Sequence, residues 1–290
     1  MDRRILILGA SGQVGSNLAK KLSERPDVMP ISAVRRVDAV VTGEQSNSVF
    51  LDLDRPETIA PALDGIDSIF LLTGYTVDML RQSKSLIDAA RKMSVKHIVH
   101  LGACGDDDTD VAHYGWHQFV ERYIEWSGIP FTHLRPEVFL ENLLGYSGVR
   151  TVSDGVIRHY VGSARQVWVD VDDIAEVAAV VLSERDQHLG KTYRLGYELR
   201  SLHEIAEIMS RVMGKPYRYE ARPPEEFLRN VLEAGAEPAY MDCAYRSFIR
   251  LGTEGIPGSE EVFDNFEQLT GRKPTSVEDF IRKHAAEFAY

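Results

Sequence analysis

Residues 4–15 have the sequence RILILGASGQVG, in which a short apolar run leads directly into three glycines spaced three residues apart. The run has the length and composition of a buried strand, and a helical pattern follows it. In such a strand–turn–helix unit, the first glycine permits a tight turn, the second lets the backbone approach a pyrophosphate, and the third allows close packing. The helix N-terminus also offers N–H groups to phosphates. The stretch therefore predicts a dinucleotide site formed by Gly9, Ser11, Gly12, Gln13, Val14 and Gly15.

Apolar runs of strand length recur through the first half of the chain, with helical patterns between most of them. The runs are residues 4–8, 29–34, 48–51, 68–72, 97–101 and 131–134. This alternation predicts an α/β fold of the Rossmann type, a doubly wound parallel sheet with crossover helices. The pattern loosens after residue 136. We therefore expect an NAD(P)-binding domain over residues 1–150 and a smaller α+β substrate lobe over 151–290, interleaved with the Rossmann core.

Two pairs of residues have the spacing of a capping box, which marks the start of a helix. The first pair is Asp54 with Glu57, and the second is Ser201 with Glu204. In each pair the first side chain is expected to accept a hydrogen bond from the helix backbone. Further helices are predicted over residues 77–94, 114–126 and 172–182.

Composition excludes several classes of protein. The formal net charge of −11 argues against nucleic acid as a direct partner, which would require a basic face. Two cysteines are too few for a disulfide framework, and no apolar run is long enough to span a bilayer. The first residues lack the charged-then-apolar pattern of a secretion signal, so we expect none. We expect a cytoplasmic monomer or homodimer that acts on a small molecule and binds no membrane.

The residues about 20 positions after the glycine loop bear on the choice of cofactor. An NAD-binding unit normally has Asp or Glu there, to bind the ribose hydroxyls. Here the stretch is Ala33-Val34-Arg35-Arg36, without a carboxylate. Because an Arg can bind a 2′-phosphate with two hydrogen bonds, Arg35 favours NADP(H). The alternatives are that both arginines are solvated surface charges, or that Asp38 allows NAD(H).

Segments along almost the whole chain resemble the NmrA-like branch of the atypical short-chain dehydrogenase/reductases. These segments are residues 9–15, 33–35, 51–52, 95–98, 127–136, 170–175, 190–193 and 204–206. The resemblance implies a parallel sheet of six or seven strands, a small C-terminal substrate lobe, and NADP(H) bound at the strand ends. It assigns the adenine to the neighbourhood of Asp52 and Leu53, and the ribose and nicotinamide path to Thr73, Gly74, Gly102 and Ala103.

The usual proton machinery of that superfamily is missing from this chain. A standard short-chain dehydrogenase uses a Ser, and a Tyr followed four residues later by a Lys that lowers the tyrosine pKa. Here residues 100–104 contain no serine, and the residue four after Tyr114 is Gln118. We assign a role as proton donor or orienter to His117, because the ordinary pKa of histidine suits proton donation, and name Tyr114 as the second catalytic candidate. The alternative is that these side chains only pack the helix.

The leading hypothesis is therefore an NAD(P)H-dependent oxidoreductase that transfers hydride to a small aromatic or conjugated acceptor. Members of the family reduce quinones, azo dyes and cationic dyes, which need little help with protonation. The substrate pocket is assigned to Pro136, Phe139 and Asn142. His113, His117 and Glu121 have metal-ligand spacing on a helix, but we expect no metal because the dinucleotide site explains the region.

Two other functions remain open. The founding NmrA protein of the family is understood as a regulator, so the chain is alternatively a nucleotide sensor without turnover, which the missing Tyr/Lys pair favours. A sugar-nucleotide epimerase-like enzyme is the third hypothesis, and the same missing pair counts most heavily against it.

Overall fold

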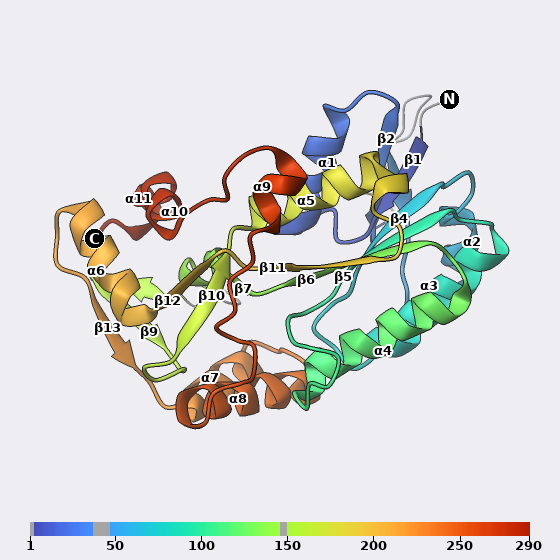
Figure 1. The fold of residues 1–290 in the computed structure, drawn as a ribbon. Helices are drawn as coiled ribbons and strands as arrows, with labels where there is room; N and C mark the ends of the chain where they lie inside the picture. The colour runs from blue at the N-terminus through green and yellow to red at the C-terminus, as the bar shows by residue number, and fades with distance from the viewer. Residues whose placement is uncertain (1–2, 37–46, 146–149) are drawn as a thin grey trace. The chain divides into compact units, whose positions relative to one another are not determined.

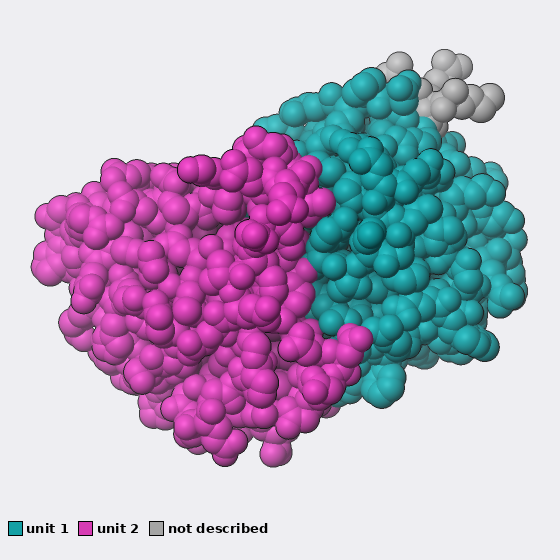
Figure 2. Space-filling model, viewed as in Figure 1, with its two compact units in different colours: residues 1–103, 115–135, 171–193 teal, residues 104–114, 136–170, 194–290 magenta. Residues whose placement is uncertain are grey.

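The computed structural model of the chain describes residues 3–36, 47–145 and 150–290. Two compact units are present, each assembled from three segments of the chain (Figure 2). Unit 1 comprises residues 1–103, 115–135 and 171–193, and unit 2 comprises residues 104–114, 136–170 and 194–290. The assignment of cofactor binding to residues 1–150 and of substrate binding to 151–290 stays a prediction.

A seven-stranded sheet forms the centre of unit 1, in the order β11-β6-β5-β4-β1-β2-β3. Its strands are β1 (Arg3–Ile7), β2 (Val28–Val34), β3 (Ser48–Phe50), β4 (Ser68–Leu72), β5 (His97–Leu101), β6 (Phe131–Pro136) and β11 (Lys191–Leu195). The pairs from β3 to β6 are parallel. β11 is parallel to β6 as well, because Gly190 N–H donates to the Phe131 carbonyl and Glu137 N–H to the Leu195 carbonyl. The Rossmann expectation is confirmed.

Helices on both faces bury the strands of this sheet. They are α1 (Gln13–Ser23), α3 (Met79–Lys92), α4 (Ala112–Ser127) and α5 (Val171–Ser183), with the short α2 (Ile59–Ala62) near one edge. α1 packs on α5, and Figure 1 shows this pair on the opposite side of the sheet from α3 and α4. Burial on two faces explains why the strands are continuous apolar runs: Ile5, Leu6 and Ile7 are all fully buried.

Unit 2 contains two small sheets with helices and its own apolar core. The sheets have the orders β12-β10-β7 and β13-β9-β8. Their strands are β7 (Val138–Phe139), β8 (Val152–Ser153), β9 (Val156–His159), β10 (Arg165–Val169), β12 (Glu198–Ser201) and β13 (Arg218–Ala221). The helices are α6 (Leu202–Met213), α7 (Pro224–Glu233), α8 (Pro238–Thr253), α9 (Asn265–Thr270), α10 (Val277–Lys283) and α11 (Ala285–Phe288). Trp168 and Phe280 belong to its buried core. In the part of the chain that is described, no helix has the length and apolarity needed to cross a membrane.

The two predicted capping boxes have different outcomes. The one at Ser201 is confirmed: its hydroxyl accepts from Glu204 N–H at 3.2 Å, and the Glu204 carboxylate accepts from Ser201 N–H at 2.7 Å. The one at Asp54 is wrong. The short 3₁₀ helix η2 (Pro56–Thr58) has no side-chain cap, and the Asp54 carboxylate instead accepts from Arg81 at 2.6 Å and Gln82 at 2.9 Å. Partners on α3 displace the local interaction.

Candidate functional site

The loop between β1 and α1 requires glycine at two of its positions. Gly9 has a φ of +67°, and its carbonyl accepts the Gly12 N–H at 2.8 Å to close the turn. A Cβ on Gly9 would lie 2.8 Å from Leu72 Cδ2, and a Cβ on Gly15 would lie 2.2 Å from the Gly9 carbonyl oxygen. The turn and the packing of α1 on it therefore exclude any side chain at these two positions.

Gly12 has a different role, because a side chain there meets little of the protein. Its Cβ would have one neighbour within 4 Å, the Gly9 carbonyl oxygen at 3.3 Å. Gly12 is the N-cap of α1, no side chain caps the helix, and the first turn has no acidic residue. Ser11, Gly12 and Gln13 are exposed, whereas Val14 and Gly15 are buried. The helix N-terminus thus presents N–H groups and positive potential to solvent, which is the geometry that binds a pyrophosphate.

All other predicted cofactor residues lie just after the strands β4 and β2, which neighbour β1 in the sheet, and after β5 and β3, which are one strand further out. They are Arg35 after β2, Asp52 and Leu53 after β3, Thr73 and Gly74 after β4, and Gly102 and Ala103 after β5. Because these strands are parallel, their carboxyl ends share one edge, where ligands of open α/β sheets bind. The structure therefore brings the predicted cofactor set together within unit 1.

Arg35 is exposed immediately beyond the end of β2. Hydrogen bonds from Gln82 and Arg81 lower the pKa of Asp54, and the nearby charge of Arg35 adds to this effect. Arg35 is thus near Asp54, which follows β3 and is bound by residues of α3, and a 2′-phosphate on the adenine ribose is expected in this region. Asp38, the residue that kept NAD(H) open, lies outside the described residues.

His117 belongs to a cluster of buried polar side chains that the sequence did not reveal. Its ring centre lies 5.6 Å from that of His100 on β5, which lies 5.9 Å from that of His133 on β6. One turn after His117, Glu121 accepts from Arg135 through two hydrogen bonds, Nε to Oε1 at 3.0 Å and Nη2 to Oε2 at 2.5 Å. This histidine–glutamate–arginine cluster, here called the α4 cluster, is entirely within unit 1.

The protonation of His100 follows from its surroundings. Burial lowers its pKa well below the ordinary value, and the nearby His117, His133 and Arg135 lower it further. His100 is therefore a neutral imidazole at neutral pH. Neither of its ring nitrogens has a hydrogen-bond partner, although the side chain is fully buried.

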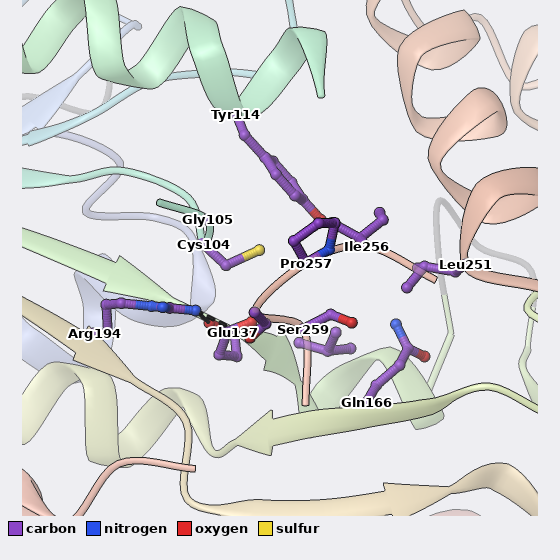
Figure 3. A pocket seen from close by; sticks show the side chains of 12 residues that line it. Cys104, Gly105, Tyr114, Glu137, Gln166, Arg194, Leu251, Ile256, Pro257 and Ser259 are labelled. Carbon is purple, nitrogen blue, oxygen red and sulfur yellow. Dashed lines mark hydrogen bonds and ion pairs between the residues drawn. The ribbon is translucent and has the colours of Figure 1, made fainter. Parts of the chain in front are cut away.

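Tyr114, in the first turn of α4, lines a pocket of unit 2 (Figure 3). Cys104 and Glu137 face the same space, and Leu251 and Ile256 contribute apolar surface. Burial raises the pKa of the Cys104 thiol and of the Tyr114 hydroxyl; the hydrogen bond between them adds to the shift of Tyr114 and opposes that of Cys104. Both groups hold their protons at neutral pH.

Glu137 is the titratable group of this pocket that sequence analysis missed. It is buried, and its Oε1 lies 3.0 Å from Nη2 of Arg194, which also pairs with Asp106 at 3.0 Å and Glu261 at 2.9 Å. Burial raises the pKa of Glu137 to about 7, although the hydrogen bond and charge of Arg194 oppose the shift. The carboxyl is thus poised to gain or lose a proton near neutral pH. In the sequence, Glu137 could have been recognised as a candidate because this acidic residue lies between Pro136 and a short apolar strand.

The predicted pocket residues lie beside this pocket without lining it. Pro136 ends β6, Phe139 ends β7, and Asn142 lies in the 3₁₀ helix η3 (Leu140–Leu143). Asn142 contributes its carbonyl to the Thr151 hydroxyl at 2.7 Å. Glu137 and Val138, which follow Pro136 in the sequence, are among the residues that line the pocket.

Comparison with known proteins gives consistent results over the whole chain. A model described as the NmrA-like family matches residues 1–281. The NAD(P)H azoreductase of Xenophilus azovorans is 28% identical over 292 residues, with 98% of this chain and 99% of the azoreductase covered. The (4-alkanoyl-5-oxo-2,5-dihydrofuran-3-yl)methyl phosphate reductase of Streptomyces griseus is 30% identical over 289 residues, with coverage of 98% and 99%. The crystal structure of Citrobacter sp. triphenylmethane reductase complexed with NADP(H) has the same fold, with a TM-score of 0.79 and 23% identity over 97% of this chain and 99% of that one.

Proposed function

Since the chain belongs to the NmrA-like family, we propose that it is an NAD(P)H-dependent oxidoreductase acting on a small aromatic or conjugated acceptor. The glycine loop carries this proposal: it opens an uncapped helix N-terminus at the strand edge where all the predicted cofactor residues lie. Two relatives that match over their whole length are named as reductases, which supports an enzyme. NADP(H) is the favoured cofactor, because Arg35 stands where a 2′-phosphate is expected. When bound, the cofactor supplies the hydride.

The class of acceptor follows from the relatives and from the missing proton machinery. One relative is named for azo compounds and the other for a dihydrofuranone with a conjugated acyl group. Both substrates are conjugated electrophiles. Gln118 replaces the lysine of the standard Tyr/Lys pair, which suits acceptors that delocalise charge after hydride addition. Cytoplasmic location, a monomeric or homodimeric state and the absence of a nucleic-acid partner belong to the same proposal.

Glu137 is the proton donor that the unit 2 pocket offers to such an acceptor. A two-electron reduction takes one hydride from the cofactor and one proton from the protein. The Glu137 carboxyl supplies that proton and regains it from solvent, and Tyr114 and Cys104 bind the acceptor beside it. A pKa of about 7 is close to the optimum for a general acid at neutral pH. His117 stays the alternative donor or orienter that the sequence suggested.

The decisive experiment measures the rate of NADPH oxidation by absorbance in the presence of candidate acceptors: quinones, azo dyes, cationic dyes, enones and aldehydes. Turnover is expected with at least one conjugated acceptor, and Gly12→Val is expected to abolish it. Tight NADP(H) binding with no turnover on any acceptor would support the sensor hypothesis, which the missing lysine at Gln118 favours.

A pH profile tests the assigned donor. Because the protonated carboxyl is the active form, kcat/KM should fall as the pH rises through about 7, the pKa of Glu137. Glu137→Gln should remove this decline and lower the rate by about 10²–10⁴-fold, the usual contribution of a general acid. The loss should be larger for an enone or aldehyde than for a quinone.

Glu261→Gln is the matched control for that profile. Glu261 also pairs with Arg194, but it is exposed and does not line the pocket. Its substitution should leave both the rate and the pH dependence unchanged. An unaltered decline above pH 7 in Glu137→Gln would remove Glu137 from the mechanism.

A further inference from the structure

We propose that the α4 cluster of unit 1 is a binding site for a divalent transition-metal ion of the Zn²⁺ type, with His100, Glu121 and His133 as ligands. One potential ligand atom from each residue lies within 4.8 Å of the others. All three side chains are buried. The proposal does not depend on the proposed reductase activity.

Sheet register places the three ligands on one face. His100 and His133 are partners at the same level of the adjacent parallel strands β5 and β6, so their side chains project to the same side. α4 connects these strands and supplies Glu121. Two imidazoles and a carboxylate form a donor set that binds zinc in many proteins. The sequence spacing identified Glu121, but it paired Glu121 with His113 and His117 instead of the two strand histidines.

His100 gives the independent reason to expect a ligand. Both of its ring nitrogens are buried without a hydrogen-bond partner, and an unsatisfied buried polar group destabilises a folded protein. His97, three residues earlier on the same strand, has Thr132 Oγ1 at 2.9 Å from its Nε2. A bound metal ion would satisfy one nitrogen of His100, which lies within 4.8 Å of the ligand atoms of the other two residues.

The surroundings of the other two ligands resemble the outer shell of a metal site. Metal-bound histidines usually donate their second ring nitrogen to a carboxylate, and ligating carboxylates are themselves hydrogen-bonded. His133 Nε2 lies 3.2 Å from Glu125 Oε1, which makes Nδ1 the proposed ligand atom. Glu121 is held by Arg135. The Arg135 charge opposes a cation, so we expect weaker binding than at an all-thiolate structural site.

Gly102 leaves room for an ion and gives it access. A Cβ on this residue would lie 3.3 Å from Glu121 Oε1 and 3.5 Å from His100 Nδ1, so a side chain there would crowd the ligands. Gly102 is only half-buried, whereas the ligands are buried. Zinc–nitrogen bonds near 2.1 Å put two ligand atoms of a tetrahedral ion about 3.3 Å apart. The widest pair therefore has to close by about 1.5 Å, which side-chain rotation can supply.

Metal titration of the untagged, EDTA-treated full chain tests the proposal. Co²⁺ should bind at one ion per chain and give the visible absorption of a low-symmetry N/O site, and Zn²⁺ should displace it. His100→Phe should abolish the spectrum. Because that variant risks misfolding, Glu125→Gln gives a second test: loss of an outer-shell partner should weaken Zn²⁺ binding by about 10–100-fold in calorimetry.

His203→Gln is the matched control, because His203 is an exposed histidine of unit 2. It should bind Co²⁺ and Zn²⁺ like the parent chain. The proposal is overturned if the parent shows no saturable Co²⁺ spectrum, if folded His100→Phe binds with unchanged affinity, or if His203→Gln loses binding as severely as His100→Phe.

Discussion

Two strand-to-helix connections of the same sheet, here called crossings, depend on different parts of the chain: one on the backbone and the other on side chains. The β1–α1 crossing is made of backbone: a glycine with positive φ, a carbonyl that closes the turn, and uncapped N–H groups. The β5–α4 crossing is made of side chains, with histidines from two strands and an ion pair that joins Glu121 of α4 to Arg135 of β6. Both lie within unit 1.

This difference explains why one site was visible in the sequence and the other was not. The shape of a backbone turn depends on which of a few consecutive residues lack a Cβ, so glycine spacing reports it directly. A side-chain cluster depends on which strands become neighbours, and no local spacing encodes that. Side chains added to the glycine loop of the first crossing should therefore weaken cofactor binding. At the second crossing, the loss of a single charged partner should lower the stability of the fold.

The largest effect is expected at the first crossing. Gly12→Val places a side chain where the pyrophosphate approaches and costs at least two hydrogen bonds to a charged group, each contributing about 1.5–3 kcal/mol. NADPH affinity measured by calorimetry should fall by about 10²–10⁴-fold, with only a small change in melting temperature because the Cβ would meet the Gly9 carbonyl oxygen at 3.3 Å. Gly15→Ala, by contrast, should also lower the melting temperature, because its Cβ meets the Gly9 carbonyl at 2.2 Å. Undiminished NADPH affinity in Gly12→Val would remove the assigned cofactor site.

The next largest effect concerns the stability of the second crossing. Glu121→Gln leaves the Arg135 guanidinium buried without its anionic partner, which should lower the free energy of unfolding by about 3–5 kcal/mol in urea. NADPH affinity should change far less than in Gly12→Val. Glu57→Gln, which breaks an exposed pair with Arg55, is the control and should not alter stability measurably. A collapse of NADPH binding in folded Glu121→Gln would show that the two crossings act as one site.

Cofactor preference is expected to respond less strongly. Arg35→Ala should weaken NADPH binding more than NADH binding, because only NADPH carries the 2′-phosphate. Loss of a hydrogen bond to a charged group, about 1.5–3 kcal/mol, corresponds to a fall in preference of about 10–100-fold. Arg36→Ala should change the ratio less. Equal losses for both cofactors in Arg35→Ala would indicate stacking on the adenine without contact to the phosphate.

The smallest effect is expected for His117→Ala. This imidazole is buried beside His100, so its removal should reduce turnover severalfold and equally for all acceptors, with nearly unchanged NADPH affinity. Steady-state rates of the parent chain and of His117→Ala, each with a quinone and with an aldehyde, measure the loss of turnover for the two kinds of acceptor. A loss of about 10²-fold or more, concentrated on the aldehyde, would make His117 the proton donor in place of Glu137.

The sequence by itself determined the features that depend on neighbours in the chain. The glycine loop, the alternation of strands and helices and the Ser201–Glu204 capping box all join residues a few positions apart, so spacing encodes their geometry. The position of Arg35 after the second strand follows from the same alternation.

Only the tertiary structure decided the interactions between distant residues. Asp54 has the same spacing to Glu57 as Ser201 has to Glu204, yet Arg81 and Gln82 on α3 bind its carboxylate. The α4 cluster joins β5, α4 and β6. Burial raises the pKa of Glu137 to about 7 against the opposing charge of Arg194, which lies on β11. Such contacts depend on the order of strands in the sheet and on desolvation, which arise only when the chain is folded.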